Sequence, residues 1–252
     1  MYYMIKYGYN GMKFSGFQRG NGTNSVEDNI IKTLNKYQIA TSIESAARTD
    51  RYVSALGNVF LIETGQDIDK IMRILNARIK NMFFISYAIL DCYFNPRHNT
   101  AKYYSYIMGS VIDIEKIISI LKKFEGKHDF INFCRADGRN TIRTIDSVNC
   151  WDYNGMHIIN FYGKSFVWHQ LRSIIAYAER SKAGDDPFSL EKKFTYLADP
   201  EPLILMDIIY DGIKFTNFDF KHSKKYLDSM VNNARIESTI YDLLYIKGNI
   251  KQ

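Results

Sequence analysis

One carboxylate of the chain, Asp50, stands in a setting that could support chemistry. It ends the run Arg48-Thr49-Asp50, which follows three small residues. An apolar-alternating run starts at Ile43 and a second covers Leu56 to Thr64, so we expect Asp50 on the connection between two strands. A carboxylate at a strand end is supported by the sheet, as reactive side chains usually are. By itself the tripeptide is more often a surface Arg–Asp pair or an aspartate that caps a helix.

The cysteines and histidines form no local metal motif. The cysteines are isolated, odd in number and without CxxC spacing, which argues against a disulfide framework and a zinc site: Cys92, Cys134 and Cys150. We expect them to be buried thiols. The histidines are equally scattered, although residues far apart in sequence can still converge in space: His98, His128, His157, His169 and His222. The sequence therefore predicts no metal.

Length and composition indicate a globular protein without a membrane span. The 252 residues can bury a substantial core, and 46% of them are hydrophobic. No apolar run approaches the roughly 18 residues that suggest a spanning helix. The first residues indicate a strand rather than a signal peptide, so we expect a cytoplasmic protein.

The charge balance suits a polyanionic partner. The net charge is +6, and 15% of the residues are aromatic, 19 of them tyrosines. Aromatic faces can stack on bases while Lys and Arg bind phosphates, so this interleaving favours RNA. A tyrosine-rich core would produce the same composition, and it is about as probable an explanation.

The first half of the chain predicts a βαββαβ unit. Ser25, with Asp28 three residues later, is a capping pattern for the first helix. The expected elements are strands over Tyr2–Tyr7, Ile43–Ala47, Leu56–Thr64 and Phe83–Leu90, a helix from Ser25 to about Tyr37 and a helix beginning at Asp67. This order is that of the ferredoxin-like fold, which RNA-recognition motifs also use.

The second half predicts the same order with additions. Pro96 marks the most probable boundary, so we expect an N-terminal half over residues 1–98 and a C-terminal half over residues 99–252. The expected elements are strands over Lys102–Met108, Ile145–Tyr153, Met156–Tyr162 and Leu203–Tyr210, and helices over Asp113–Phe124, from Ser165, at Pro187 and over Lys224–Ile246. Asn154-Gly155 predicts a hairpin turn. The predicted fold class is α+β, with two ferredoxin-like halves in a continuous, mainly antiparallel sheet and an active-site cleft between them.

The stretch around Asp50 resembles the signature of the tRNA pseudouridine synthase A family. That signature reads Gly-Arg-Thr-Asp-x-Gly-Val-His-Ala-x-Gly-x-Val, and this chain matches it at the Arg-Thr-Asp run, at Val53 and through the run that ends at Val59. The chain departs from it where Ala47 replaces Gly, Arg51 and Tyr52 replace Ala-Gly, and Ser54 replaces His. These departures leave the loop conformation open, because tyrosine adopts positive φ less readily than glycine.

Five further motifs follow in the same order as in that family. The run from Tyr9 to Arg19 is similar to Tyr-Asp-Gly-x-x-Tyr-x-Gly-Trp-Gln-Arg. The others are Thr100–Tyr106, similar to Thr-Ala-Arg-Arg-Tyr-Arg-Tyr; Gly126–Phe133, similar to Gly-x-His-Asp-Phe-x-x-Phe; Ser165–Arg172, similar to x-Phe-Val-His-His-Met-Val-Arg; and an apolar position in Glu201–Ile208. Their collinearity from Tyr9 to about Tyr210 makes the resemblance specific.

The resemblance implies a role for each matching residue. Asp50 matches the catalytic aspartate, and Arg172 matches the arginine that pairs with it. Tyr104 matches the tyrosine that stacks on the target uracil. The residues that match substrate-binding positions are Arg48, which assists base flipping, Thr49, Tyr106 and Leu205. Taken without the resemblance, Tyr104 is more often a packing tyrosine, Leu205 a core residue and Arg172 as often a solvated helix arginine.

The implied activity is isomerisation of uridine to pseudouridine at positions 38 to 40 of the tRNA anticodon stem-loop, by a homodimer, without a metal or organic cofactor. The sequence leaves open which position is modified and whether the aspartate attacks the sugar or abstracts its 2′ proton. The main alternative is a catalytically silent RNA-binding protein with two RNA-recognition-like halves. A metal-dependent nuclease is disfavoured, because no carboxylate cluster has metal-ligand spacing.

Overall fold

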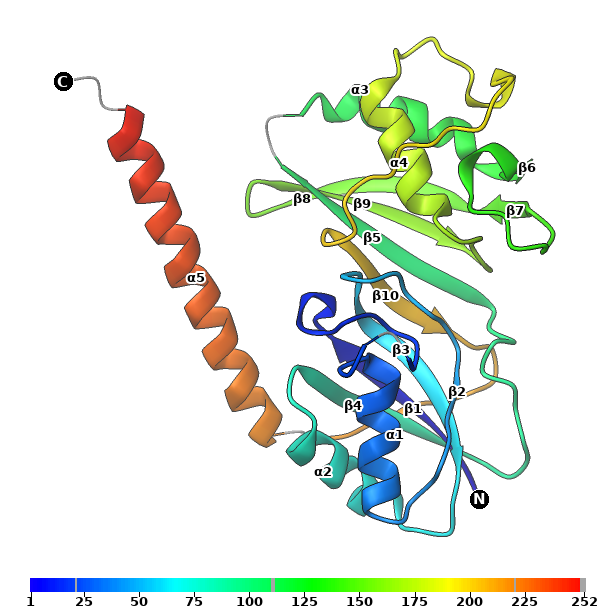
Figure 1. The fold of residues 1–252 in the computed structure, drawn as a ribbon, viewed down its shortest axis with the longest axis vertical. Coiled ribbons are helices and arrows are strands. Elements are labelled where there is room, and N and C mark those ends of the chain that lie inside the picture. Colours follow the sequence, from blue (N-terminus) through cyan, green and yellow to red (C-terminus); the bar gives the residue numbers. More distant parts are fainter. Residues whose placement is uncertain (21, 110–111, 220, 250–252) are drawn as a thin grey trace.

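Two βαββαβ units share one sheet in the computed structural model, which describes residues 1–20, 22–109, 112–219 and 221–249. In these residues the sheet has nine strands, in the order β11-β4-β1-β3-β10-β5-β9-β8, with β2 pairing with β3 off this path. All pairs along it are antiparallel except β3 with β10. The two units lie end to end, with the N-terminal one in blue and cyan (Figure 1).

The first unit has the strand order of the ferredoxin-like fold, β4-β1-β3-β2. Its elements are β1 (Tyr2–Tyr9), α1 (Val26–Lys36), β2 (Glu44–Ser45), β3 (Ser54–Glu63), α2 (Ile68–Arg78) and β4 (Met82–Leu90). Both helices start as the sequence predicts, because Ser25 accepts a hydrogen bond from the backbone N–H of Asp28 and Asp67 accepts one from that of Lys70.

The second unit repeats this order as β10-β5-β9-β8. Its elements are β5 (Ala101–Gly109), α3 (Ile114–Leu121), β8 (Ser147–Tyr153), β9 (Met156–Gly163), α4 (Gln170–Arg180) and β10 (Leu203–Ile209). The predicted hairpin at Asn154-Gly155 is confirmed, because β8 and β9 pair directly across that turn. Insertions in this unit add β6 (Gly126–Asp129), which pairs with β7 (Ile142–Ile145), and three short 3-10 turns, η2 (Lys122–Phe124), η3 (Ile131–Phe133) and η4 (Pro187–Ser189). A further 3-10 turn, η1 (Gly11–Lys13), follows β1 in the first unit.

The two units meet where β3 pairs with β10. Ser54 lies opposite Ile204 and Ala55 opposite Leu205, while β2 occupies the other end of the same edge of β3. The expected α+β class with a continuous, mainly antiparallel sheet is confirmed. The division of the chain at residues 98 and 99 stays a prediction.

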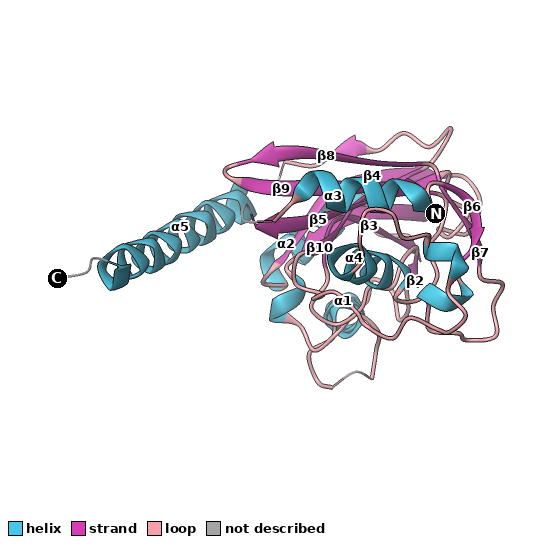
Figure 2. Ribbon diagram, turned by 90° about the horizontal axis from the view of Figure 1, so that it is seen from above, coloured by secondary structure: helices cyan, strands magenta, loops and turns pink. Residues whose placement is uncertain are grey.

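Helices α1, α2 and α4 lie on the same side of the sheet (Figure 2). Two hydrophobic clusters form the core, and each is centred on one of the two units. They interlock, because Val53 from the first half packs into the second cluster while Leu205 from the second half packs into the first. Tyr104 packs against both clusters. The seam between the units is therefore a packed one, and it lies beside the Asp50 loop.

Strand β2 is shorter than the Ile43–Ala47 run that the sequence predicts. The Ala46 N–H still donates to the Val59 carbonyl at 2.9 Å, but from Ser45 onward side chains bind the backbone carbonyls. Arg97 donates to the Ser45 carbonyl, Lys102 to that of Ala46 and Asn58 to that of Ala47. The chain therefore leaves the ladder early and enters the Asp50 loop from a fixed position.

The final helix, α5 (Lys221–Asn249), extends away from the body (Figure 1). The short strand β11 (Thr216–Asn217) precedes it and pairs with β4. Near its start the Tyr226 ring stacks on Phe83 with centroids 6.5 Å apart, and the Tyr226 hydroxyl donates to the Asn81 side chain at 3.1 Å. In the described part of the chain, no helix is both long and apolar enough to cross a membrane.

Candidate active site

The loop from Ala47 to Ser54 presents Asp50 at the junction of the two units. A turn closes on the backbone bond from the Val53 N–H to the Asp50 carbonyl, 3.2 Å long. Within this turn Tyr52 has φ +74°, in the left-handed region. The matching family position is glycine, and this chain has in its place a residue that adopts the left-handed conformation at a cost. The Arg51 guanidinium lies 4.6 Å from the centre of the Tyr52 ring and so packs on it.

The run from Tyr9 to Arg19 contacts this loop and holds it in place. The hydroxyl oxygens of Tyr9 and Thr49 are 2.8 Å apart, within hydrogen-bonding distance. Gly11 donates its N–H to Ser54 Oγ at 3.0 Å, and a Cβ at Gly11 would lie only 2.2 Å from the Val53 carbonyl oxygen. A side chain at this position would therefore push the loop away. Ser54, which replaces the family histidine, is thus part of the contact between motif and loop.

Both oxygens of the Asp50 carboxylate accept hydrogen bonds from the segment that begins α4. Arg172 Nη1 donates to Oδ2 at 3.1 Å, and Trp168 Nε1 donates to Oδ1 at 3.0 Å. His169 Nε2 lies 3.5 Å from Oδ2. The side chain of Asp50 is 21% exposed and that of Arg172 is 14% exposed, so the pair is shielded but reachable.

Arg172 is held from its other side as well. Its Nε donates to the Ala198 carbonyl at 2.8 Å, and the Ala198 N–H donates to the Arg172 carbonyl at 2.9 Å. The guanidinium therefore divides its donors between a fixed backbone group and Asp50. A planar fork anchored in this way aims its remaining N–H groups along one direction.

The sequence predicts a helix that opens at Ser165, but the segment before α4 is not helical. Helix α4 begins at Gln170, because His169 has φ +68° in the left-handed region. The Gln170 side chain accepts the Val167 N–H at 2.9 Å and tightens this turn. As a result Trp168 and His169 lie in a loop and turn towards Asp50.

The surroundings of His169 disfavour its protonated form. Burial lowers its pKa below the ordinary 6.5, and nearby positive charges lower it further, while the Asp50 carboxylate acts in the opposite direction. These positive charges are Arg172, Arg135 and Lys193. Arg172 is therefore the charged partner of Asp50 in this group.

Tyr104 lies at the seam, and its ring meets the edge of Phe166 with centroids 5.3 Å apart. Burial, followed by the nearby Tyr9 and Asp50, raises the pKa of the Tyr104 hydroxyl. Its hydroxyl thus stays protonated at physiological pH. A partly buried aromatic ring close to a carboxylate is a suitable platform for a flat base.

The other predicted substrate residues differ in burial and in their surroundings. Thr49 precedes Asp50 and is held by Tyr9. Leu205 is fully buried between Tyr104 and Ala55 in the sheet. Tyr106 is 4% exposed and belongs to the second cluster.

Arg48 is exposed at the mouth of a separate cavity of about 220 Å³ that Arg97 and Pro96 also line. The structure thus brings Asp50 and Arg172 together and places Thr49 next to them. Leu205 and Tyr106 lie in the cores of the two units, and Arg48 faces this cavity.

Sequence reasoning assigned no site role to Trp168, His169 or Tyr9, although all three lie inside the quoted motifs. His169 could have been selected as a candidate site residue, because it is a histidine within a motif that matches the family. For Trp168 no local signal existed, because the family motif has histidine at that position. Their roles depend on which way the turn before α4 points the side chains.

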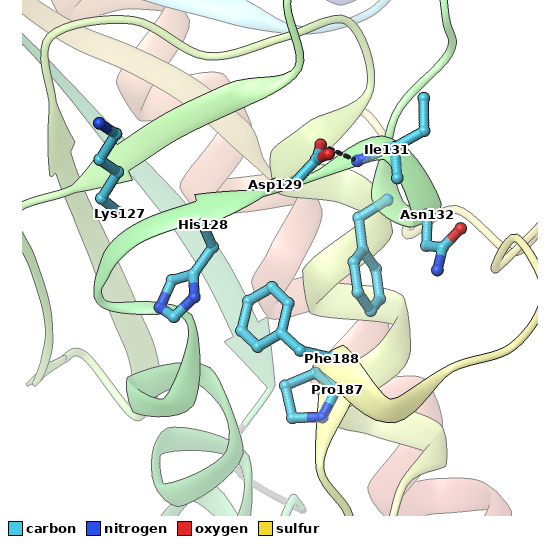
Figure 3. A pocket seen from close by; sticks show the side chains of 8 residues that line it. Lys127, His128, Asp129, Ile131, Asn132, Pro187 and Phe188 are labelled. Carbon is cyan, nitrogen blue, oxygen red and sulfur yellow. Dashed lines mark hydrogen bonds between the residues drawn. The ribbon is translucent and has the colours of Figure 1, made fainter.

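The Gly126–Phe133 motif builds a different cavity, of about 430 Å³ (Figure 3). The His128 ring stacks on Phe188 with centroids 4.1 Å apart, and its Nε2 lies 2.8 Å from the Glu125 carbonyl. Asp129 accepts the Ile131 N–H at 3.0 Å. The side chains of His128 and Asp129 are thus engaged in contacts within this part of the second unit.

One group of described residues could hold a metal ion. Cys150, Asp152 and His157 present ligand atoms within 4.8 Å of one another on the β8–β9 hairpin, with His157 Nδ1 2.6 Å from an Asp152 oxygen. The expectation of buried thiols is wrong for Cys92, which is exposed, and for Cys150, which is half-buried. Only Cys134 is buried. None of these side chains belongs to the Asp50 group.

The Asp50 group is suited to one kind of chemistry. It combines one carboxylate with fixed N–H donors, a single cationic partner and an aromatic ring. A carboxylate held in this way can act as a nucleophile, or it can accept a proton from a sugar or a nucleobase.

Comparison with known proteins agrees with this arrangement. The sequence model of a family described as tRNA pseudouridine synthase matches residues 120–211. A tRNA pseudouridine synthase A of Picrophilus torridus is 52% identical over 222 residues, covering 88% of this chain and 87% of that protein. A tRNA pseudouridine synthase A of Thermoplasma acidophilum is 45% identical over 245 residues, which cover 95% of this chain and 97% of that protein. A chain of a solved Cbf5-Nop10-Gar1 complex aligns with 71% of this chain and 43% of its own length, at 16% identity and a TM-score of 0.39, which is too low to support any conclusion.

Proposed function

Because this chain belongs to the tRNA pseudouridine synthase A family, we propose that it modifies uridines at positions 38 to 40 of the tRNA anticodon stem-loop. The class of reaction follows from the family: the enzyme is an isomerase that converts uridine of tRNA to pseudouridine. The position on the tRNA and the roles of individual residues are the content of the proposal.

One observation supports the assignment of the site more than any other. Asp50 and Arg172 come from different halves of the chain, and they meet at 3.1 Å with the carboxylate partly open to solvent. A surface ion pair would not need the second anchor that Ala198 gives Arg172. This arrangement favours a working carboxylate over a silent RNA-binding protein.

In the proposed reaction Asp50 assists the replacement of the glycosidic C1′–N1 bond by a C1′–C5 bond. The bond between C1′ of the ribose and N1 of uracil breaks, the uracil turns, and C1′ bonds to C5. The proton on C5 is lost and N1 gains one, so no oxidant or phosphoryl donor takes part. Attack on C1′ and removal of the 2′ proton both use the same carboxylate.

The remaining residues bind and present the target. Tyr104 offers its ring to the uracil, and Arg48 fills the space that the flipped nucleotide leaves. Thr49 holds the loop through Tyr9. Leu205 and Tyr106 support the ring of Tyr104 from the sheet and exclude water behind it.

We also propose a homodimer, working in the cytoplasm, in which the second subunit helps to bind the tRNA body. The exposed apolar side chains on the projecting part of α5 support this, since a second copy could cover them: Ile236, Ile240 and Leu243. Light scattering of the full chain at micromolar concentration should give the mass of a dimer. A monomer at every concentration would contradict this part of the proposal.

Position specificity is tested by incubating the protein with an unmodified tRNA transcript and mapping pseudouridine by chemical labelling and sequencing. The proposal expects product at position 38, 39 or 40. A matched transcript with cytidine at these three positions should give none. Product confined to another region of the tRNA would contradict the proposed specificity.

A further inference from the structure

We propose that Trp168 is a positioning residue for Asp50, whose indole N–H fixes the plane of the carboxylate while Arg172 holds its other oxygen. The inference rests on the proposed role of Asp50 in the reaction. It concerns a residue at which this chain departs from the family motif, which has histidine there. Trp168 has no place in the proposal for substrate binding given above.

The geometry requires a second donor. The torsion that turns an aspartate carboxylate about its Cβ–Cγ bond is soft, so one hydrogen bond leaves the plane of the group poorly defined. Arg172 engages Oδ2 at 3.1 Å, and Trp168 engages Oδ1 at 3.0 Å. With one donor on each oxygen, rotation breaks at least one hydrogen bond to a charged group.

Arg135 contacts both the ring and the backbone of Trp168. The Arg135 guanidinium lies 4.2 Å from the centre of its ring, and the Arg135 N–H donates to the Trp168 carbonyl at 2.9 Å. The left-handed turn at His169 directs the indole towards Asp50. Trp168 is 39% exposed, so part of its ring is open to solvent while its N–H donates to Asp50.

The choice of donor has a chemical consequence. An indole N–H is a donor only and does not titrate in the physiological range. A histidine at the same position could place its Nε2 where the indole Nε1 lies, but it would donate reliably only when protonated or in one tautomer. The contact between Trp168 and Asp50 therefore does not itself change with pH, whereas a contact from histidine at this position would; the titratable neighbour of the carboxylate is His169, whose Nε2 lies 3.5 Å from Oδ2.

The contact can be tested in the free protein, without RNA. The chain has two tryptophans, Trp151 and Trp168, so a ¹H–¹⁵N spectrum should hold two indole signals. Trp168→Phe assigns its own signal by loss. In Asp50→Ala the Trp168 indole proton should move upfield and the Trp151 proton, on the distant hairpin, should not. If the chemical shift of the Trp168 indole proton is the same in Asp50→Ala as in the parent, the inference is wrong.

The effect on catalysis is tested with single-turnover rates. Trp168→Phe keeps a ring and removes the N–H, so the rate should fall about ten- to hundredfold, the usual loss for a hydrogen bond to a charged group. tRNA affinity should stay close to that of the parent. The matched control is Trp151→Phe, whose parent side chain is 49% exposed, and it should keep the parental rate.

Trp168→His supplies the rescue. It should recover most of the rate on the acid side, where the imidazole is protonated, and less of it at higher pH, so that the ratio of its rate to the parent's depends on pH. A purely structural role would make both variants equally slow at every pH, and that result would overturn the inference. A loss of tRNA affinity in Trp168→Phe with an unchanged rate would also overturn it, because it would make the indole an RNA contact.

The outcomes separate this inference from the proposed function. If the parent forms no pseudouridine in the tRNA, the proposed function fails, and the indole signal still decides whether the contact exists. If the parent is active and Trp168→Phe matches it, only the positioning role fails.

Discussion

Arg172 reaches Asp50 across 122 positions of sequence, with its Nη1 3.1 Å from Oδ2. The same guanidinium donates from Nε to the Ala198 carbonyl. One arginine thus connects the loop of the first unit, the helix of the second unit and the chain that returns to β10. The two halves are aligned at the carboxylate by this side chain.

Arg172→Leu should therefore slow pseudouridine formation strongly. If Asp50 reacts as proposed, loss of a charge-assisted hydrogen bond to its carboxylate should cost about 1.5–3 kcal/mol of transition-state stabilisation. tRNA binding should change little. The measurement is the single-turnover rate beside the dissociation constant, and the matched control is Arg180→Leu on the same helix, which should keep the rate. An unchanged rate in Arg172→Leu would remove Arg172 from the site.

Tyr9 and Tyr7 offer a matched test of the loop support. Tyr9 bonds with Thr49, whereas the buried hydroxyl of Tyr7 has no hydrogen-bond partner among the described residues. Tyr9→Phe should lower the free energy of unfolding by about 1 kcal/mol and reduce the rate, because it releases Thr49. Tyr7→Phe should leave the stability equal or raise it, because it removes an unpaired polar group. Urea unfolding of both variants measures this, and equal losses would contradict the assigned contacts.

The left-handed conformation of Tyr52 predicts an unusual order of stability. Glycine normally destabilises a chain relative to alanine, but at φ +74° it avoids the clash of a Cβ. Tyr52→Gly should therefore be more stable than Tyr52→Ala by about 1 kcal/mol. Both variants lose the contact with Arg51, so their difference isolates the backbone. If alanine proves the more stable, the turn does not have this conformation in solution.

His169 gives a prediction for pH. Its pKa lies below 6.5, so as the pH falls below 6.5 the unfolded chain binds the proton first, and the contribution of His169 to stability declines until the folded pKa is passed. Asp50 is the neighbour that raises this pKa, so Asp50→Asn should lower it further. NMR titration of the His169 ring proton, assigned with His169→Gln, measures both values. A midpoint above 6.5 in the parent would mean that pairing with Asp50 outweighs burial.

The elements that follow from local chemistry could be predicted from the sequence. Helix α2 buries Ile68, Ile71, Met72 and Leu75, which recur at helical spacing, and its N-cap is Asp67, where the sequence predicts that the helix begins. Capping and periodicity involve neighbours in sequence, so they need no knowledge of the fold. The βαββαβ order followed from them.

The features that depend on distant partners could not be predicted in the same way. Strand β2 ends early because Arg97 and Lys102 satisfy its carbonyls from another part of the chain. The contact of Asp50 with Arg172 was expected only from the family resemblance. The contact with Trp168 was not expected at all, because it depends on the left-handed turn at His169 and on the stacking of Arg135.

The central claim, that Asp50 carries the reaction, is tested most directly by Asp50→Asn. Asparagine is nearly isosteric and removes the charge, the basicity and the nucleophile while keeping a side chain that Trp168 and Arg172 can surround. The variant should fold, bind tRNA within a few-fold of the parent and form no pseudouridine in a single turnover. Measurable pseudouridine from Asp50→Asn, at a rate above that of tRNA alone, would contradict the account.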